Sequence, residues 1–252
     1  MALQDEVLQK ATRLAEDYQQ VFGPDLISVI LYGSALTSEY LPRKSDLNFL
    51  IVLTEKGIEE LHLAHGLVVR WRKQRVGTPL FLTRAYISSS LETFPIEFLN
   101  IRRNYRVING EDVLADLVFH KEHIRMQCEH ELKGKLLLLR QRYVEAGGKS
   151  RILRTLLVES LPTFLFVFRA LLYLLDKEIP ATKKDTIHLL ATELQLDEEL
   201  FLTLLKMREQ KLKLAGSAVV ELFRQYLKEI RRLALLMDEY DFAARNFSSQ
   251  EN

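Results

Sequence analysis

The sequence contains a single cysteine, Cys128, so no disulfide can form within the chain. It also has no leading segment in which basic residues precede an apolar stretch, as a secretory signal would require. Proteins that fold without disulfides are typical of reducing compartments. We therefore expect a cytoplasmic protein.

The sequence also lacks an excess of either charge, since 35 lysines and arginines face 34 aspartates and glutamates. No net field attracts nucleic acid or an anionic membrane, although a local basic patch remains possible. The most apolar stretch, residues 161–175, is shorter than the roughly 20 residues that span a bilayer, and it contains Arg169. We expect a buried helix there and no membrane partner.

The length and the apolar content fit an ordinary globular protein with two modest domains. The chain has 252 residues, of which 48% are hydrophobic and 27% are charged. Domains of about 100 to 150 residues are the commonest size. The pattern of the sequence changes near His120, so we predict one domain over residues 1–120 and a second over residues 121–252.

The first part of the chain mixes helical and strand patterns. Apolar residues from Leu3 to Val21 recur at helical spacing and end at Gly23-Pro24. Thr54 is placed to cap a helix with apolar positions as far as Trp71. Short β-branched or apolar runs predict strands at Leu26–Tyr32, Leu47–Leu53, Pro79–Thr83 and Ile96–Arg102, with a short helix between the last two.

The second part is helical almost throughout, with breaks near residues 147–148, 179–180, 196–197 and 216. Its first and last helices each carry one apolar stripe, as an antiparallel bundle requires. Pro162 is expected to kink or interrupt a long apolar helix. Phe164, Phe168, Leu172, Phe223 and Leu227 are expected in the core. The predicted fold class is α+β, with a small mixed sheet and helices followed by an all-α bundle.

Polar residues gather where the first two predicted strands meet one loop. Gly33 and Ser34 follow one strand, and Ser45, Asp46 and Asn48 introduce the next. Glycine allows close approach of a phosphate, and a serine hydroxyl and backbone amides can donate to its oxygens. A carboxylate can hold the magnesium that accompanies a nucleotide. The side chains of Asp46 and Asn48 are two residues apart and so share one face of the strand.

The segment YGSALTSEYLPRKSDLNFLIVL resembles the signature of the DNA polymerase beta-like nucleotidyltransferase superfamily. In that family a strand, Gly-Ser, a loop and Ser-Asp-x-Asp lead into an apolar strand. The resemblance implies that Gly33, Ser34 and Ser45 bind the nucleotide and that Asp46 binds metal. The position of the second aspartate is occupied by Asn48.

The helical second half is similar to the bundle that follows the catalytic domain in kanamycin nucleotidyltransferase and related aminoglycoside adenylyltransferases. The family also uses a third carboxylate on a later strand, for which Glu97 is our candidate metal ligand. The resemblance implies Asp46, Asn48 and Glu97 as the catalytic positions, Mg²⁺ as cofactor and a nucleoside triphosphate as substrate. The reaction would transfer a nucleoside monophosphate to an unknown acceptor.

Two functions remain open from the sequence. An asparagine oxygen can coordinate magnesium but brings no negative charge, whereas a two-metal site needs charge to hold both ions. The first hypothesis is therefore a nucleotide-binding protein in which transfer is weak or lost. The second is a non-catalytic regulatory or scaffold protein that acts through its helical bundle, with a protein partner or a second copy of the chain.

Overall fold

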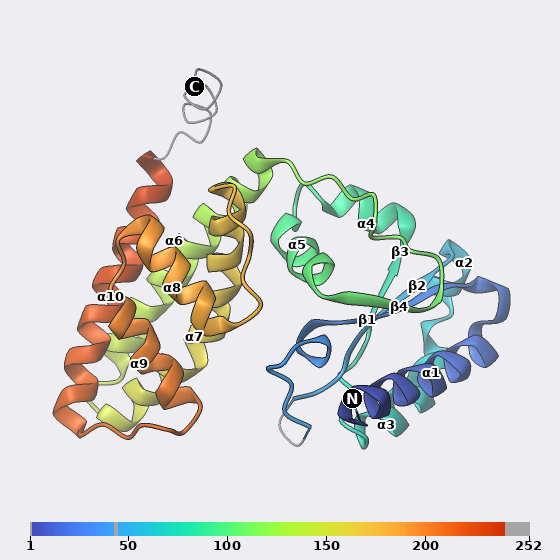
Figure 1. Ribbon diagram of the computed structural model, residues 1–252, viewed down its shortest axis with the longest axis horizontal. Helices are drawn as coiled ribbons and strands as arrows, with labels where there is room; N and C mark the ends of the chain where they lie inside the picture. The colour runs from blue at the N-terminus through green and yellow to red at the C-terminus, as the bar shows by residue number, and fades with distance from the viewer. Residues whose placement is uncertain (1, 43–44, 240–252) are drawn as a thin grey trace. The chain divides into compact units, whose positions relative to one another are not determined.

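The computed structural model describes residues 2–42 and 45–239 (Figure 1). The chain divides into two compact units, Met1–His120 and Lys121–Asn252. Each unit has its own set of elements, a mixed sheet with helices in the first and helices in the second. The α+β fold class predicted from the sequence is confirmed.

Unit 1 is built on a four-stranded sheet in the order β3-β2-β1-β4. Its strands are β1 (Leu26–Tyr32), β2 (Asn48–Leu53), β3 (Leu80–Thr83) and β4 (Tyr105–Gly110). β1 pairs antiparallel with β2 and with β4, whereas β2 and β3 are parallel. The first three strands lie where the sequence predicts them.

Helices cover both faces of this sheet (Figure 1). The α-helices are α1 (Ala2–Phe22), α2 (Glu55–Glu59), α3 (His65–Arg72), α4 (Arg84–Ser90) and α5 (Pro95–Arg103), with 3-10 turns η1 (Gly23–Asp25), η2 (Gly33–Leu36) and η3 (Leu61–Ala64). In Figure 1 α1 and α3 lie on one face, and α4 and α5 lie on the other.

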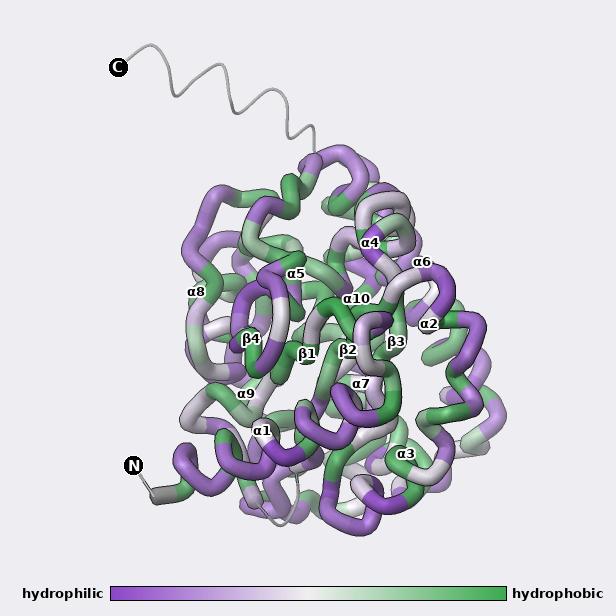
Figure 2. The backbone as a smooth tube through the Cα atoms, turned by 90° about the vertical axis from the view of Figure 1, so that its right-hand side faces the viewer, coloured by the Kyte–Doolittle hydropathy of each residue, from purple (hydrophilic) through white to green (hydrophobic). Residues whose placement is uncertain are grey.

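Successive side chains of β1 and β2 point to opposite faces of the sheet. Because they are apolar on both faces, both faces must be covered by helices. Val29, Leu31, Phe49 and Ile51 pack in one apolar cluster with the buried face of α1. The intervening residues of these strands, such as Leu50, are equally buried. Strands buried on both faces read as continuous apolar runs, and Figure 2 shows β1 and β2 largely in the hydrophobic colour.

The predicted strand at Ile96–Arg102 is wrong, because this segment forms helix α5. Pro95 occupies the first turn, where its missing N–H costs nothing. Glu97 lies in the first turn and Arg102 and Arg103 in the last, as the helix dipole favours. The helix predicted after Thr54 does begin there, with Thr54 Oγ1 accepting from the Gly57 N–H at 3.1 Å, but it divides into α2, η3 and α3.

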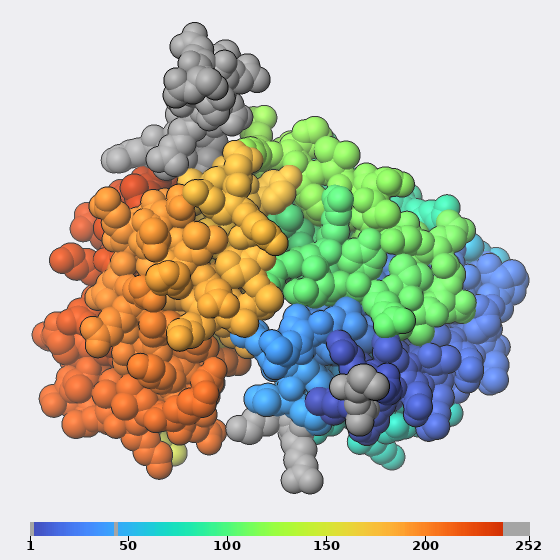
Figure 3. All heavy atoms as spheres, in the orientation of Figure 1, coloured from blue at the N-terminus to red at the C-terminus, as the bar shows by residue number. Residues whose placement is uncertain are grey.

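Unit 2 consists, in its described residues, of α6 (Lys121–Glu145), α7 (Ser150–Leu174), α8 (Lys183–Leu194), α9 (Glu198–Arg208) and α10 (Gly216–Glu239). The breaks between them fall where the sequence predicts. α7 packs against each of the other four, and in Figure 3 the orange surface of α8 and α9 largely hides it. By length and composition α7 could cross a membrane, and half of its most apolar window is buried inside the protein.

The expected core of the bundle is confirmed at Phe164, Phe168, Leu172 and Phe223, which are all buried. Leu227 is only partly buried, so the prediction for this residue is wrong. Helix α10 turns the neighbouring Tyr226 fully inward instead, where its hydroxyl pairs with Ser160 Oγ at 3.0 Å.

Candidate functional site

One edge of the sheet brings the ends of all four strands together. Tyr32 at the end of β1 pairs with Asn48 at the start of β2 and with Tyr105 at the start of β4. Next to them, Leu47 forms a parallel bridge with Val76. The residues just beyond these pairs therefore form a row along this edge, in the order of the strands.

Gly33 and Ser34 occupy the β1 position of the row. Gly33 has a φ of +87°, which side chains rarely adopt, and its N–H donates to the Asn104 carbonyl at 2.9 Å. The Ser34 carbonyl accepts from the backbone N–H and the hydroxyl of Thr37, each at 3.0 Å. The Ser34 hydroxyl has no hydrogen bond among the described residues, so it is available to a ligand.

Ser45 lies at the end of the loop that precedes β2 and bonds to the backbone of that loop. Its N–H donates to the Leu41 carbonyl at 2.8 Å, and its Oγ accepts from the Leu41 N–H at 3.2 Å. These two bonds close the end of the loop that precedes β2. Ser45 thus holds the loop, and its contact with a nucleotide stays a prediction.

Asn48 is wedged between two glycines. Its Nδ2 lies 3.4 Å from the point where a Cβ on Gly33 would stand, and its Oδ1 lies 3.2 Å from the corresponding point on Gly77. A side chain at position 77 would crowd the amide. The half-buried Asn48 is therefore accommodated by the absence of side chains at Gly33 and Gly77.

Asp46 lies outside the strand and is more exposed than Asn48. Its Oδ1 is 3.9 Å from Nη1 of Arg75, and both side chains are more than half exposed. A pair so open to water contributes little to stability. The pKa of Tyr40, in the loop before Asp46, is affected by both of these charges. Burial raises this pKa most, the carboxylates of Glu6 and Asp46 raise it further, and Arg75 lowers it.

Arg75 holds its place through the backbone. It has a φ of +59°, in the left-handed region. Its N–H donates to the Arg72 carbonyl at 3.1 Å, and its carbonyl accepts from the Leu47 N–H at 2.9 Å. The last bond ties Arg75 directly to the residue between Asp46 and Asn48.

The chain that leads into and forms β3, residues 76–83 (VGTPLFLT), contains no acidic residue. Leu80 and Leu82 stand beside Leu50 and Val52 in the parallel register. Among the described residues no group of three or more His, Cys, Asp or Glu side chains could hold a metal ion. The strand beside Asp46 and Asn48 therefore adds no carboxylate to the edge.

Glu97 is not on a strand but in the first turn of α5. The expected position of Glu97 on a later strand is therefore wrong. Its role as a metal ligand stays a prediction with no support from strand geometry.

Arg75 and Gly77 lie outside the segment that carries the family resemblance, so the motif does not indicate them. The pairing of β2 with β3 puts both beside Asp46 and Asn48. No local motif marks this pairing, because β3 follows β2 after more than twenty residues.

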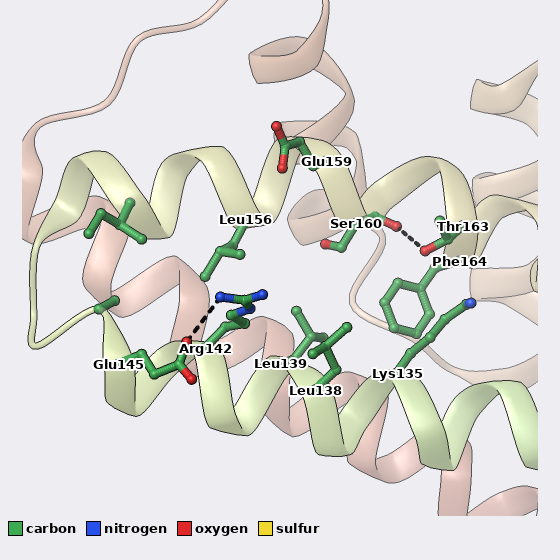
Figure 4. Close-up of a pocket in the computed structure, with 12 residues that line it drawn as sticks. Lys135, Leu138, Leu139, Arg142, Glu145, Leu156, Glu159, Ser160, Thr163 and Phe164 are labelled. Carbon is green, nitrogen blue, oxygen red and sulfur yellow. Dashed lines mark hydrogen bonds and ion pairs between the residues drawn. The ribbon is translucent and has the colours of Figure 1, made fainter.

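Unit 2 has a cavity of its own, of about 670 Å³, between α6 and α7 (Figure 4). Arg142 and Leu156 point toward each other across it, and Lys135 and Glu159 lie at its rim. Arg142 is paired with Glu145 at 3.1 Å. The cavity contains no residue of the sheet edge.

Comparisons with known proteins identify the fold. No protein-family model matches the chain, and no curated protein matches it. Among solved structures, it is similar to spectinomycin adenyltransferase AAD(9) from Enterococcus faecialis with ATP and spectinomycin, at 15% identity and a TM-score of 0.53. The match covers 89% of this chain and 98% of that one. The likeness shows a nucleotidyltransferase-type fold over both units.

Proposed function

We propose that this chain binds a nucleoside triphosphate at the edge formed by Gly33, Ser34 and Asp46, and that nucleotidyl transfer from it is weak or absent. The fold is that of an adenyltransferase whose structure holds ATP. The Ser34 hydroxyl, beside the left-handed Gly33, is open to a phosphate oxygen.

We propose weak or absent transfer because the neutral Asn48 lies between Gly33 and Gly77, where the family has its second aspartate. A magnesium ion that arrived with the triphosphate would meet one carboxylate, Asp46, and one amide oxygen. Magnesium is usually held in octahedral geometry by one or two carboxylates together with substrate phosphates and water, and two-ion catalysis needs carboxylates that serve both ions. The donors at this edge do not fit a two-ion site. Any remaining reaction would move a nucleoside monophosphate to an acceptor.

Calorimetric titration with each nucleoside triphosphate, with and without magnesium, tests this function. We expect dissociation constants in the micromolar to millimolar range, about −8 to −4 kcal/mol, and weaker binding in Ser34→Ala. Ser38→Ala is the matched control, because Ser38 is exposed in the same loop. Absence of heat at millimolar nucleotide, or equal loss in both variants, would refute nucleotide binding at this edge.

A non-catalytic role through the bundle is the second candidate. It is favoured by exposed apolar side chains on α6, among them Leu137 at 61%, Leu138 at 53% and Val144 at 78% exposure. Leu138 also lines the cavity between α6 and α7. If a second copy covers this face, light scattering will give a dimer mass that Leu138→Glu reduces to the monomer. The buried Cys128 fits the cytoplasmic setting that we propose for either function.

A further inference from the structure

Arg75 places a positive charge at the point of the sheet edge where a nucleotidyltransferase site would gather metal. Since β2 lies between β3 and β1, Asp46, just before β2, has the Arg75 guanidinium on its β3 side at 3.9 Å, and the turn that carries Ser34 follows the strand on its β1 side. The carboxylate that faces a triphosphate is thus already paired with a cation of the protein.

The backbone of the turn that carries this cation is held by the fold. Besides its own two backbone bonds, the turn that carries Arg75 is closed by the N–H groups of Gln74 and Val76, which donate to the Trp71 carbonyl at 2.9 and 3.2 Å. The Lys10 ammonium donates to the Gln74 carbonyl from α1. Trp71 is buried in the apolar cluster of unit 1, so the turn is anchored to the core.

The charges at this edge differ from those of a two-metal site. Two clustered carboxylates repel each other and a triphosphate unless cations are bound between them. Here Asp46 contributes one negative charge, Asn48 contributes none, and Arg75 contributes one positive charge. The formal charges of these three side chains sum to zero. A guanidinium fork also matches the geometry of phosphate oxygens.

We infer that Arg75 takes the place of metal at this site, so that the protein binds the triphosphate group without magnesium. The inference rests on the proposed nucleotide binding and specifies its chemistry. Asp46 then acts as the partner that orients Arg75 in the free protein, and it opposes the ligand's negative charge when the ligand arrives.

This arrangement reverses the expected effect of changing Asp46. In a metal-dependent site Asp46→Asn removes a ligand and weakens binding. In a site based on Arg75 the same change removes a repelling charge and releases the guanidinium, so binding tightens. The two mechanisms differ in the sign of one measured change.

The test is titration of the full chain with ATP and with inorganic tripolyphosphate, in magnesium and in excess EDTA. We expect the affinity in EDTA to stay within about threefold of that in magnesium, a change of less than 1 kcal/mol. Arg75→Gln should weaken binding by about tenfold or more, as loss of a charged hydrogen bond does, and Asp46→Asn should tighten it severalfold. Arg72→Gln, an exposed arginine in the last turn of α3, is the matched control.

Binding that disappears in EDTA and in Asp46→Asn, but survives Arg75→Gln, would overturn the role of Arg75 while leaving nucleotide binding intact. Absence of binding in every condition would overturn the proposed function and this inference with it. Circular dichroism melting of each variant separates loss of binding from loss of fold.

Discussion

At the scale of single residues, Asn48 is where this protein differs from its fold type. The fold is of the nucleotidyltransferase type, but this residue lacks the negative charge that a two-metal site needs. The amide fits between Gly33 and Gly77, and an aspartate has nearly the same volume. Restoring the carboxylate therefore tests charge with little change in packing.

We predict that Asn48→Asp is less stable than the parent without metal by about 1 kcal/mol, the scale of one pKa unit. The introduced carboxylate would stand near Asp46, and like charges disfavour ionisation of one of them. With magnesium and ATP present, the variant should gain more in melting temperature than the parent. Asn109→Asp, near the opposite end of β4, is the control. An equal gain in parent and variant would show that Asn48 does not occupy the second ligand position.

Tyr18 offers a second test at this scale. Its ring is fully buried between α1 and the sheet, and its hydroxyl has no hydrogen-bond partner among the described residues. A buried hydroxyl without a partner costs about 1 kcal/mol or more. Burial, with a smaller effect of Asp17, raises the pKa of Tyr18 to about 12.

We predict that Tyr18→Phe raises the free energy of unfolding by about 1 kcal/mol at neutral pH. Because the folded state holds the phenol proton more tightly than the unfolded chain, Tyr18 contributes to a loss of stability as the pH rises from about 10 to about 12. The variant should lose less stability over this range in urea titrations. The exposed Tyr86 supplies the control, Tyr86→Phe. A destabilised Tyr18→Phe would mean that the hydroxyl has a partner.

At the scale of elements, helix α7 shows how a proline is tolerated inside a long helix. Pro162 has no N–H for the carbonyl of Val158, four residues earlier. Nη1 of Arg208, from α9, donates to that carbonyl at 2.9 Å. A break at Pro162 is expected from the lost bond, but α7 continues through it. No pattern around Pro162 indicates that an arginine distant in the sequence supplies the missing donor.

We predict that Arg208→Ala lowers the free energy of unfolding by about 1 kcal/mol, the net value of one hydrogen bond. In a Pro162→Ala background the helix regains its own donor, so the same change should cost much less. Urea unfolding of the four proteins gives this coupling directly. Arg231→Ala, on an exposed position of α10, should have no effect in either background. If Arg208→Ala lowers the free energy of unfolding equally in both backgrounds, Arg208 does not compensate for the donor that Pro162 lacks.

Other elements differ in how well the sequence specifies them. β1 and β2 are predictable because they are short, apolar and bounded by turn residues, and α1 because its stripe is regular. The α5 segment failed because PIEFLNIRR is too short and too apolar for periodicity to separate a helix from a strand. Pro95 was the available signal. The pairing of Arg75 with Asp46 depends on strand order, which no local pattern contains.

At the scale of the whole molecule, the division into two compact units predicts two responses to mutation. Phe223 is fully buried in unit 2 and stacks on Tyr143, with ring centres 5.2 Å apart. Trp71, the one tryptophan of the sequence, is buried in unit 1. Tryptophan fluorescence therefore reports on unit 1, and helical circular dichroism reports mainly on unit 2.

We predict that Phe223→Ala destabilises unit 2 by about 3 to 5 kcal/mol, as large-to-small core changes do. The circular dichroism transition should move to lower urea, while the fluorescence transition and the affinity for nucleotide stay unchanged. If both transitions move together, the two units unfold as one.

The central claim is that a triphosphate binds at the edge of the sheet in unit 1. Nuclear magnetic resonance of the ¹⁵N-labelled protein during titration with ATP tests it most directly, since each backbone amide reports separately. We expect the largest shifts at Gly33, Ser34 and Gly77, with saturation in excess EDTA as well as in magnesium. Shifts confined to α6 and α7, or none at millimolar ATP, would contradict it.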